Sequence, residues 1–265
     1  MKALTKVFTI VKNESPILYW IVMILFAGAV GSVVGLVIDQ RHLMGVNVWL
    51  KPLKFFISTA VYVLTVGFLV TLYPFSKLKK HIIRNLVSWT LLLEMAIVAL
   101  QAARGIQSHY NKTDITNELL FAAMGILIAI NVLIMIFMAF ETIRVKLKTV
   151  KSLQWAILLG WLITIYGSYV GGTMIGQMAH NVGVVDGGPG LPLFNWSTIA
   201  GDLRVGHFFG LHALQIIPVF AYVSYKTLNI NHKQQVAIIT LFATAYTCFM
   251  TYTFIQALNG IPFLR

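Results

Sequence analysis

The stretch LLFAAMGILIAINVLIMIFMAF, residues 119–140, contains no charged side chain, and Asn131 is its one polar residue. A transmembrane helix needs about 20 consecutive, predominantly apolar residues. This stretch therefore predicts a membrane-spanning helix, which we place at 117–142. The whole chain has the same bias, since it is 58% hydrophobic and 11% charged, whereas soluble domains carry about 25% charged residues. The composition indicates an integral membrane protein.

Six further apolar segments are long enough to span a bilayer. With the first, they predict an all-α bundle of seven transmembrane helices that forms a single domain over residues 1–265. We place the spans near 17–39, 52–74, 84–104, 117–142, 153–178, 203–225 and 236–258. The first span follows basic residues, as a signal peptide does. However, its apolar run continues to Ile38, well beyond the roughly 7–15 residues of a signal core.

The basic residues predict the orientation of the bundle. The net charge is +12, but no soluble basic domain is present to bind nucleic acid. Of the 20 Lys and Arg residues, 13 fall at the N-terminus and in alternate connections, and 7 fall on the other side. The richer side is expected to be cytoplasmic. The N-terminus is then inside and the C-terminus outside.

Polar residues gather where several spans are expected to end on the outer side. In a helix, residues three, four and seven apart share a face. By this rule Glu94, Gln101 and Arg104 share one face, and Arg204 and His207 share another. The pattern predicts a bundle with a polar interior that opens outward. The candidate ligand-binding residues are Lys54, Glu94, Gln101, Arg104, His109, His180, Asp202, Arg204, His207, His212 and Gln215.

Some of these residues have a structural interpretation beside the functional one. Glu94 lies near mid-membrane, where an ionised carboxylate costs roughly 2.5–3.5 kcal/mol on insertion scales, so we expect it to be protonated or paired. The arginines have the alternative of reaching lipid head groups, and Asp202 that of capping the sixth span.

We expect Arg204 and His207 to point towards the outer end of the third span, where Arg104 lies. Two arginines brought together repel unless a carboxylate, water or an anion lies between them. Glu118 and Asp202 are the internal carboxylates available. If neither reaches the arginines, the pair marks a site for an external carboxylate or phosphate.

Four histidines near the expected outer face, His109, His180, His207 and His212, raise the alternative of a haem or metal site. His207 and His212 are about 140° apart around a helix, so they cannot easily chelate one ion together. No HExxH or CxxCH motif is present. The other interpretation is hydrogen bonding or proton handling, and the sequence leaves the cofactor unknown.

The long outer connection, residues 180–202, combines turn residues in DGGPG with apolar side chains. Because exposing a cluster of apolar side chains to water is unfavourable, we expect residues 186–196 to be ordered against the bundle. The side chains concerned are Leu191, Leu193, Phe194 and Trp196.

Several motifs resemble those of a family of uncharacterised bacterial inner-membrane proteins with seven spans. They are KPLKF at 51–55, QAARG with SHYN at 101–111, DGGPGLPL with NWS at 186–197, and GDLRVGHFFGLHALQ at 201–215. The resemblance implies a multi-pass protein of the bacterial cytoplasmic membrane and brings no activity with it.

We therefore expect a membrane protein with an outward-facing polar pocket for a small polar or amphiphilic, anionic ligand. Such a protein acts as a transporter or a membrane-embedded enzyme, and the sequence does not decide whether it is an enzyme. The alternatives are a haem or metal redox protein, and a non-catalytic sensor or assembly factor. The expected partners are the lipid bilayer and a small-molecule ligand, without nucleic acid, and a homo-oligomer is left open.

Overall fold

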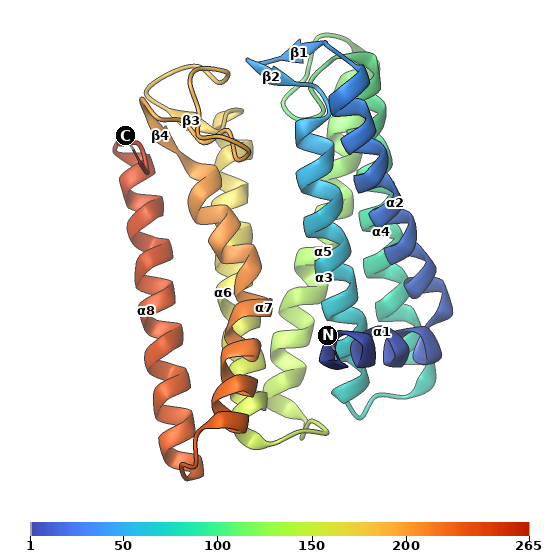
Figure 1. Cartoon of the computed structure of the whole chain (residues 1–265), viewed down its shortest axis with the longest axis vertical. Helices are drawn as coiled ribbons and strands as arrows, with labels where there is room; N and C mark the ends of the chain where they lie inside the picture. Colours follow the sequence, from blue (N-terminus) through green and yellow to red (C-terminus); the bar gives the residue numbers. More distant parts are fainter. Residues whose placement is uncertain (1, 265) are drawn as a thin grey trace. The chain divides into compact units, whose positions relative to one another are not determined.

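The computed structural model describes residues 2–264, and its long elements are all helices (Figure 1). Seven of them are long and apolar enough to cross a membrane, which confirms the expected all-α fold with seven spans. The protein is therefore a polytopic membrane protein, and its orientation stays a prediction. The spanning helices are α2 (Pro16–Ile38), α3 (Leu50–Leu72), α4 (Lys77–Arg104), α5 (Ile115–Arg144), α6 (Lys151–Gln177), α7 (Leu203–Thr227) and α8 (His232–Leu258).

The start of α4 differs most from the sequence expectation, which placed the third span at 84–104. The helix begins at Lys77 because the Ser76 side chain caps it by accepting a hydrogen bond from the backbone N–H of Lys79. Its first turns are basic, so hydropathy does not reveal them. A helix can extend beyond the apolar core of a membrane when its first turns are polar.

A shorter helix, α1 (Lys2–Glu14), was not expected from the sequence. In Figure 1 it runs crosswise to α2, α3 and α4 at one end of these helices. The Arg84 side chain, which is 3% exposed, fixes its C-terminal end by donating to the Glu14 carbonyl at 3.0 Å and pairing with the Glu14 carboxylate at 3.4 Å. An amphipathic sequence in this position is typical of a helix that lies in the membrane interface.

The chain folds into two compact units, Met1–Ile134 and Met135–Arg265, which we call the first and second units. Helix α5 contributes its first part to one unit and its last part to the other. The expectation of one transmembrane domain over residues 1–265 stays a prediction.

Two short antiparallel hairpins order the connections. In the first unit, β1 (His42–Leu43) pairs with β2 (Val46–Asn47) through a two-residue turn. Both turn residues, Met44 and Gly45, have positive φ angles, as a type I′ turn requires. In the second unit, β3 (Asn181–Val182) pairs with β4 (Gly201–Asp202) and so closes the long loop between α6 and α7.

In the second unit, α6 and α7 approach each other at two glycines. A Cβ atom on Gly167 would lie 2.6 Å from the Cα of Gly210, closer than real Cβ contacts allow. This close contact of backbones is typical of helices that pack through small residues in a membrane. It also brings the Gly167 carbonyl within reach of a side chain on α7, described below.

Candidate functional site

In the first unit, a polar cluster joins one end of α4 to the start of α5. The Gln101 side-chain amide donates to the Asn117 Oδ1 atom at 2.8 Å, and Arg104 donates to Gln101 at 2.8 Å and to Asn117 at 3.1 Å. Gln101 is fully buried, whereas Arg104 is exposed. The predicted face of Gln101 and Arg104 therefore exists, and its partner is an asparagine that sequence analysis did not single out.

Asp114 completes this cluster from the residue before α5. Its Oδ1 atom accepts the backbone N–H of Asn117 at 2.9 Å, and its other oxygen accepts from the Asn117 side chain. The backbone hydrogen bond from Asn117 lowers the pKa of Asp114 most, and the positive charge of Arg104 lowers it further. Asp114 thus fixes Asn117, which in turn positions the arginine.

A second group of polar side chains surrounds His109, in the loop after α4. The His109 Nδ1 atom lies 3.1 Å from Lys51 Nζ and 3.0 Å from Ser108 Oγ. The rings of Phe55 and Phe121 lie 6.0 and 6.3 Å from the His109 ring, measured between centroids. The cluster is therefore polar on one side and aromatic on the other.

Glu94 is buried in α4, with 7% of its surface exposed. The charge of Lys51, in the first turn of α3, acts on this carboxyl group. Lys54 lies one turn further along α3 and is partly buried. Lys51 therefore acts both on Glu94 and on the His109 cluster, and the expectation that Glu94 is protonated or paired stays a prediction.

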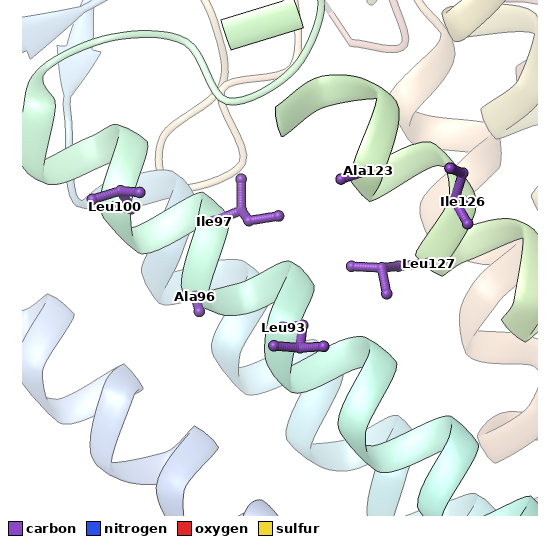
Figure 2. A pocket seen from close by; sticks show the side chains of 7 residues that line it. All are labelled: Leu93, Ala96, Ile97, Leu100, Ala123, Ile126 and Leu127. Carbon is purple, nitrogen blue, oxygen red and sulfur yellow. The ribbon is translucent and has the colours of Figure 1, made fainter. Parts of the chain in front are cut away.

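An apolar hollow of about 450 Å³ lies between α4 and α5. Figure 2 shows that its seven lining side chains all come from these two helices and are all apolar. Half or more of the side-chain surface of Leu93, Leu100 and Ile126 is exposed, so the hollow is open at the protein surface. We call it the α4–α5 hollow, and it is lined by Leu93, Ala96, Ile97, Leu100, Ala123, Ile126 and Leu127.

Hydrogen bonds between helices hold both ends of the α4–α5 hollow. At one end are the bonds of Gln101 and Arg104 to Asn117. At the other, the Asn131 side chain donates to the Thr90 Oγ1 atom at 2.7 Å, and both residues are buried. Since the two asparagines lie about four helical turns apart on α5, they face the same helix. The spacing between α4 and α5 is thereby set by polar contacts.

In the second unit, Asp202 organises the end of the long loop. Its side chain accepts the backbone N–H of Arg204 at 3.0 Å, which confirms the predicted N-cap of α7. It also accepts the backbone N–H of Ser197 at 2.8 Å and pairs with the Arg204 guanidinium at 2.6 Å. Arg204 donates a further bond to the Asn195 carbonyl.

This arrangement meets the condition under which the sequence requires no external anion at Arg204. An internal carboxylate, that of Asp202, reaches the guanidinium and compensates its charge. Arg204 therefore ties the loop to α7. Arg204 was also expected to point towards Arg104 at the outer end of α4. Because the two arginines belong to different units, this stays a prediction.

The long loop is held by a second carboxylate and by aromatic packing. Asp186 accepts the backbone N–H groups of His180 and Asn181 and lies 2.7 Å from the His180 Nδ1 atom. Burial raises the pKa of Asp186, but these hydrogen bonds and the charge of His180 outweigh it and hold the pKa at about 2. The loop is thus built around a carboxylate that stays ionised.

The expectation of an ordered loop holds for its aromatic residues. The Trp196 side chain is 7% exposed, and its ring stacks with that of Phe194 at 4.5 Å and meets that of Phe208 edge-on at 5.6 Å. Leu193 is instead 57% exposed. It has a positive φ angle, and this turn directs its side chain away from the helices.

His207 and His212 each bond to a backbone carbonyl. The His207 Nδ1 atom lies 2.8 Å from the Gly167 carbonyl of α6, and the His212 Nδ1 atom lies 2.8 Å from the Phe208 carbonyl of its own helix. Gln215 lies further along α7 and is partly buried. Within residues 2–264, no three His, Cys, Asp or Glu side chains gather closely enough to hold a metal ion. The two carbonyl contacts give His207 and His212 a hydrogen-bonding role, and the haem or metal alternative stays untested.

Comparison with protein-family models, with curated protein sequences and with solved structures gives no match. The resemblance to an uncharacterised bacterial family stays a prediction, as does the location in a bacterial cytoplasmic membrane.

Sequence analysis missed Asn117 and Asn131 as functional positions. The available signal was their spacing, because two asparagines on one face of a long apolar helix predict two contacts with a neighbouring helix. Lys51 was not among the candidates for another reason. Its meeting with His109 depends on the path of the loop after α4, which periodicity does not encode.

Proposed function

We propose that this protein binds an anionic amphiphile in the first unit. The apolar tail occupies the α4–α5 hollow, and the anionic head group lies at Arg104. The observation that carries the proposal is the hollow itself, which is wholly apolar along its walls and is bounded at one end by a cluster containing an exposed arginine.

The geometry supports a ligand with one long tail. Leu93, Ile97, Leu100 and Arg104 follow one another at helical spacing on α4, so they form a continuous stripe. At about 1.5 Å per residue, the stripe from Leu93 to Arg104 is about 16 Å long. A ligand lying along it places apolar carbon on the leucines and its polar end at the guanidinium.

The charge of Arg104 supports an anionic head group. The direct hydrogen bonds of its guanidinium go to the neutral amide groups of Gln101 and Asn117. A carboxylate or phosphate accepts two parallel bonds from a guanidinium, which is the strongest arrangement available to it. Lys51 and His109 add further polar groups beside Phe121 of α5.

The proposed binding of a head group includes a role for Glu94. The charge of Lys51 acts on the Glu94 carboxyl group, which is buried in α4, and the same ammonium group lies 3.1 Å from His109 Nδ1. Glu94 is in this view a positioning residue that sets the charge at the head-group end.

The proposal is tested by native mass spectrometry of detergent-solubilised protein titrated with laurate, and with dodecanol as a neutral analogue of matching chain length. Ala123→Phe fills the hollow, and its control Ala122→Phe adds the same side chain at an exposed neighbouring position. Arg104→Gln removes the head-group charge, and Arg41→Gln removes an arginine that already pairs with Asp39.

We expect Ala123→Phe to weaken laurate binding roughly tenfold or more, because the phenyl ring takes the place of several tail methylenes at about 0.8 kcal/mol each. Arg104→Gln should abolish the preference for laurate over dodecanol. Both controls should bind laurate as the unmodified protein does. Equal binding by Ala123→Phe, or equal binding of the two ligands to the unmodified protein, would contradict the proposal.

A further inference from the structure

A second hollow, also of about 450 Å³, lies in the second unit where the α5–α6 connection meets the α7–α8 connection. We call it the basic hollow, because three of its lining side chains are Lys146, Lys151 and His232. Thr149 and Ser152 contribute hydroxyl groups to the same wall. It shares no lining residue with the α4–α5 hollow.

The cationic groups of the basic hollow are not compensated by acidic side chains. No Asp or Glu is among its lining residues. Within residues 2–264, the ion pairs of this unit involve other arginines and histidines, and Lys146, Lys151 and His232 take part in none of them. Lys146 and Lys151 are both exposed and line the same hollow, and an anion bound between two ammonium groups reduces their mutual repulsion.

A buried amide group also points to a ligand. The Gln235 side chain is 6% exposed and lines the hollow. Its Oε1 atom accepts a hydrogen bond from Ser152 Oγ at 2.9 Å, and this bond joins α8 to α6. The Gln235 side-chain N–H groups donate to no other group among residues 2–264. The amide nitrogen is not one of the fully buried atoms that lack a partner, so these donors are accessible and can reach an acceptor in the hollow.

The N-terminus of α6 adds partial positive charge beside the hollow. Helix α6 begins at Lys151, and its N-cap residue Val150 provides no side-chain hydrogen bond. The first N–H groups of a helix carry partial positive charge and bind anions when no side chain caps them. Helix α8 is different, because Asn231 and Gln234 form a capping box that satisfies its first N–H groups.

The wall that carries the two lysines is ordered. The Gln154 side chain donates to the carbonyls of Thr142 and Val145 at 2.8 Å each, and it accepts the backbone N–H of Leu147 at 3.0 Å. These three bonds fix the path of the α5–α6 connection next to Lys146. The backbone that carries Lys146 therefore has a defined path.

We propose that the basic hollow binds a phosphate group, supplied by an anionic lipid head group or by a free phosphate compound. A phosphate offers several strong acceptor oxygens and up to two negative charges, which match the lysines, the histidine and the Gln235 amide. The hollow lies on the side of the bundle expected to be cytoplasmic, where basic pockets between spanning helices meet lipid head groups. This site is independent of the amphiphile site at α4 and α5.

The test uses the full chain in two arms. In the first, native mass spectrometry counts dioleoyl phosphatidic acid bound to the detergent-solubilised protein, with dioleoyl phosphatidylcholine as the reference lipid. In the second, isothermal titration calorimetry measures inorganic phosphate binding. The first variant is a double substitution, Lys146→Gln together with Lys151→Gln. The second is Gln235→Glu, which keeps an acceptor for Ser152 but places a carboxylate in the hollow. Lys148→Gln is the matched control, because Lys148 is exposed in the same connection and does not line the hollow.

We expect the double lysine variant and Gln235→Glu each to bind phosphatidic acid roughly tenfold or more weakly, as the loss of charge-assisted hydrogen bonds implies. The control should bind normally. Phosphatidic acid binding without inorganic phosphate binding identifies a lipid head group as the source, and competition between the two identifies a free phosphate as well. Normal phosphatidic acid binding by the double lysine variant, or a loss with Lys148→Gln equal to that with the double variant, would overturn the proposal. Ala123→Phe should leave phosphatidic acid binding unchanged. A failure of the phosphate proposal can therefore be told apart from a failure of the amphiphile proposal.

Discussion

Replacing Asp202 should lower the free energy of unfolding more than replacing any other carboxylate at the start of a helix in this chain. Asp202→Ala removes the N-cap of α7, which is worth about 1 kcal/mol. It also leaves the buried backbone N–H of Ser197 without its acceptor, at about 1–3 kcal/mol. Arg204 loses its carboxylate partner but is 26% exposed and keeps its bond to Asn195. That loss is therefore smaller, at about 1 kcal/mol, than in a fully buried pair.

These contributions predict that Asp202→Ala lowers the free energy of unfolding by about 3–5 kcal/mol. Asp202→Asn keeps an oxygen for the N-cap and should lose about 1 kcal/mol less. Glu118→Ala is the control, because Glu118 lies in the first turn of α5 and is exposed. It should change stability by at most about 0.5 kcal/mol.

The assay is unfolding by sodium dodecyl sulfate in mixed micelles, followed by tryptophan fluorescence. Limited proteolysis of the 183–199 loop provides a local readout, since the loss of the Ser197 bond should expose this segment to cleavage. If Asp202→Ala unfolds at the same detergent fraction as Glu118→Ala, the carboxylate does not hold the loop, and the account of the second unit is wrong.

Three further predictions follow from particular contacts. The pKa of Asp186 is about 2, below its unfolded value of about 3.9, so its contribution to loop order is present above pH 4 and lost as the pH falls towards 2. Pepsin cleavage of the loop should rise over that range, and Asp186→Asn should remove this pH dependence. Gly167→Ala should cost about 1–3 kcal/mol by overpacking against α7, whereas Gly172→Ala, whose Cβ meets nothing within 4 Å, should be tolerated, as detergent unfolding would measure. A cysteine at Lys112 should react with an impermeant maleimide applied outside cells, and one at Lys148 should not; the opposite labelling would reverse the predicted orientation.

The spans were predictable because composition and length alone decide which segments can cross a membrane. Helix α1 was not, because its sequence is too short and too polar to span. Its position depends on the contact of Arg84 with Glu14, which joins residues far apart in sequence. Hydropathy therefore identified the spans and missed the helix that lies at one end of α2, α3 and α4 (Figure 1).

In the candidate site, contacts between neighbouring residues were predictable from the sequence, whereas contacts between helices were not. The N-cap role of Asp202 was predictable because it depends on neighbouring residues alone. The pairing of Arg204 with Asp202 is also local, and Asp202 was one of the two carboxylates expected to be available to the arginines. Periodicity placed Gln101 on the same face of α4 as Arg104. It did not predict the partner Asn117, because periodicity does not show which neighbouring helix that face contacts. The hollow between α4 and α5 depends on the distance between helices and has no signature in the sequence.

Photolabelling is the sharpest test of whether an anionic amphiphile lies between α4 and α5. The protein in phosphatidylcholine nanodiscs is irradiated with a fatty acid that carries a diazirine near the end of its chain, and the labelled residues are identified by peptide mass spectrometry. The account predicts that the adducts concentrate on residues 93–100 and 123–127, that excess laurate competes with them, and that Ala123→Phe removes them. Adducts spread evenly over the apolar faces of α2 and α8, and unaffected by laurate, would contradict it.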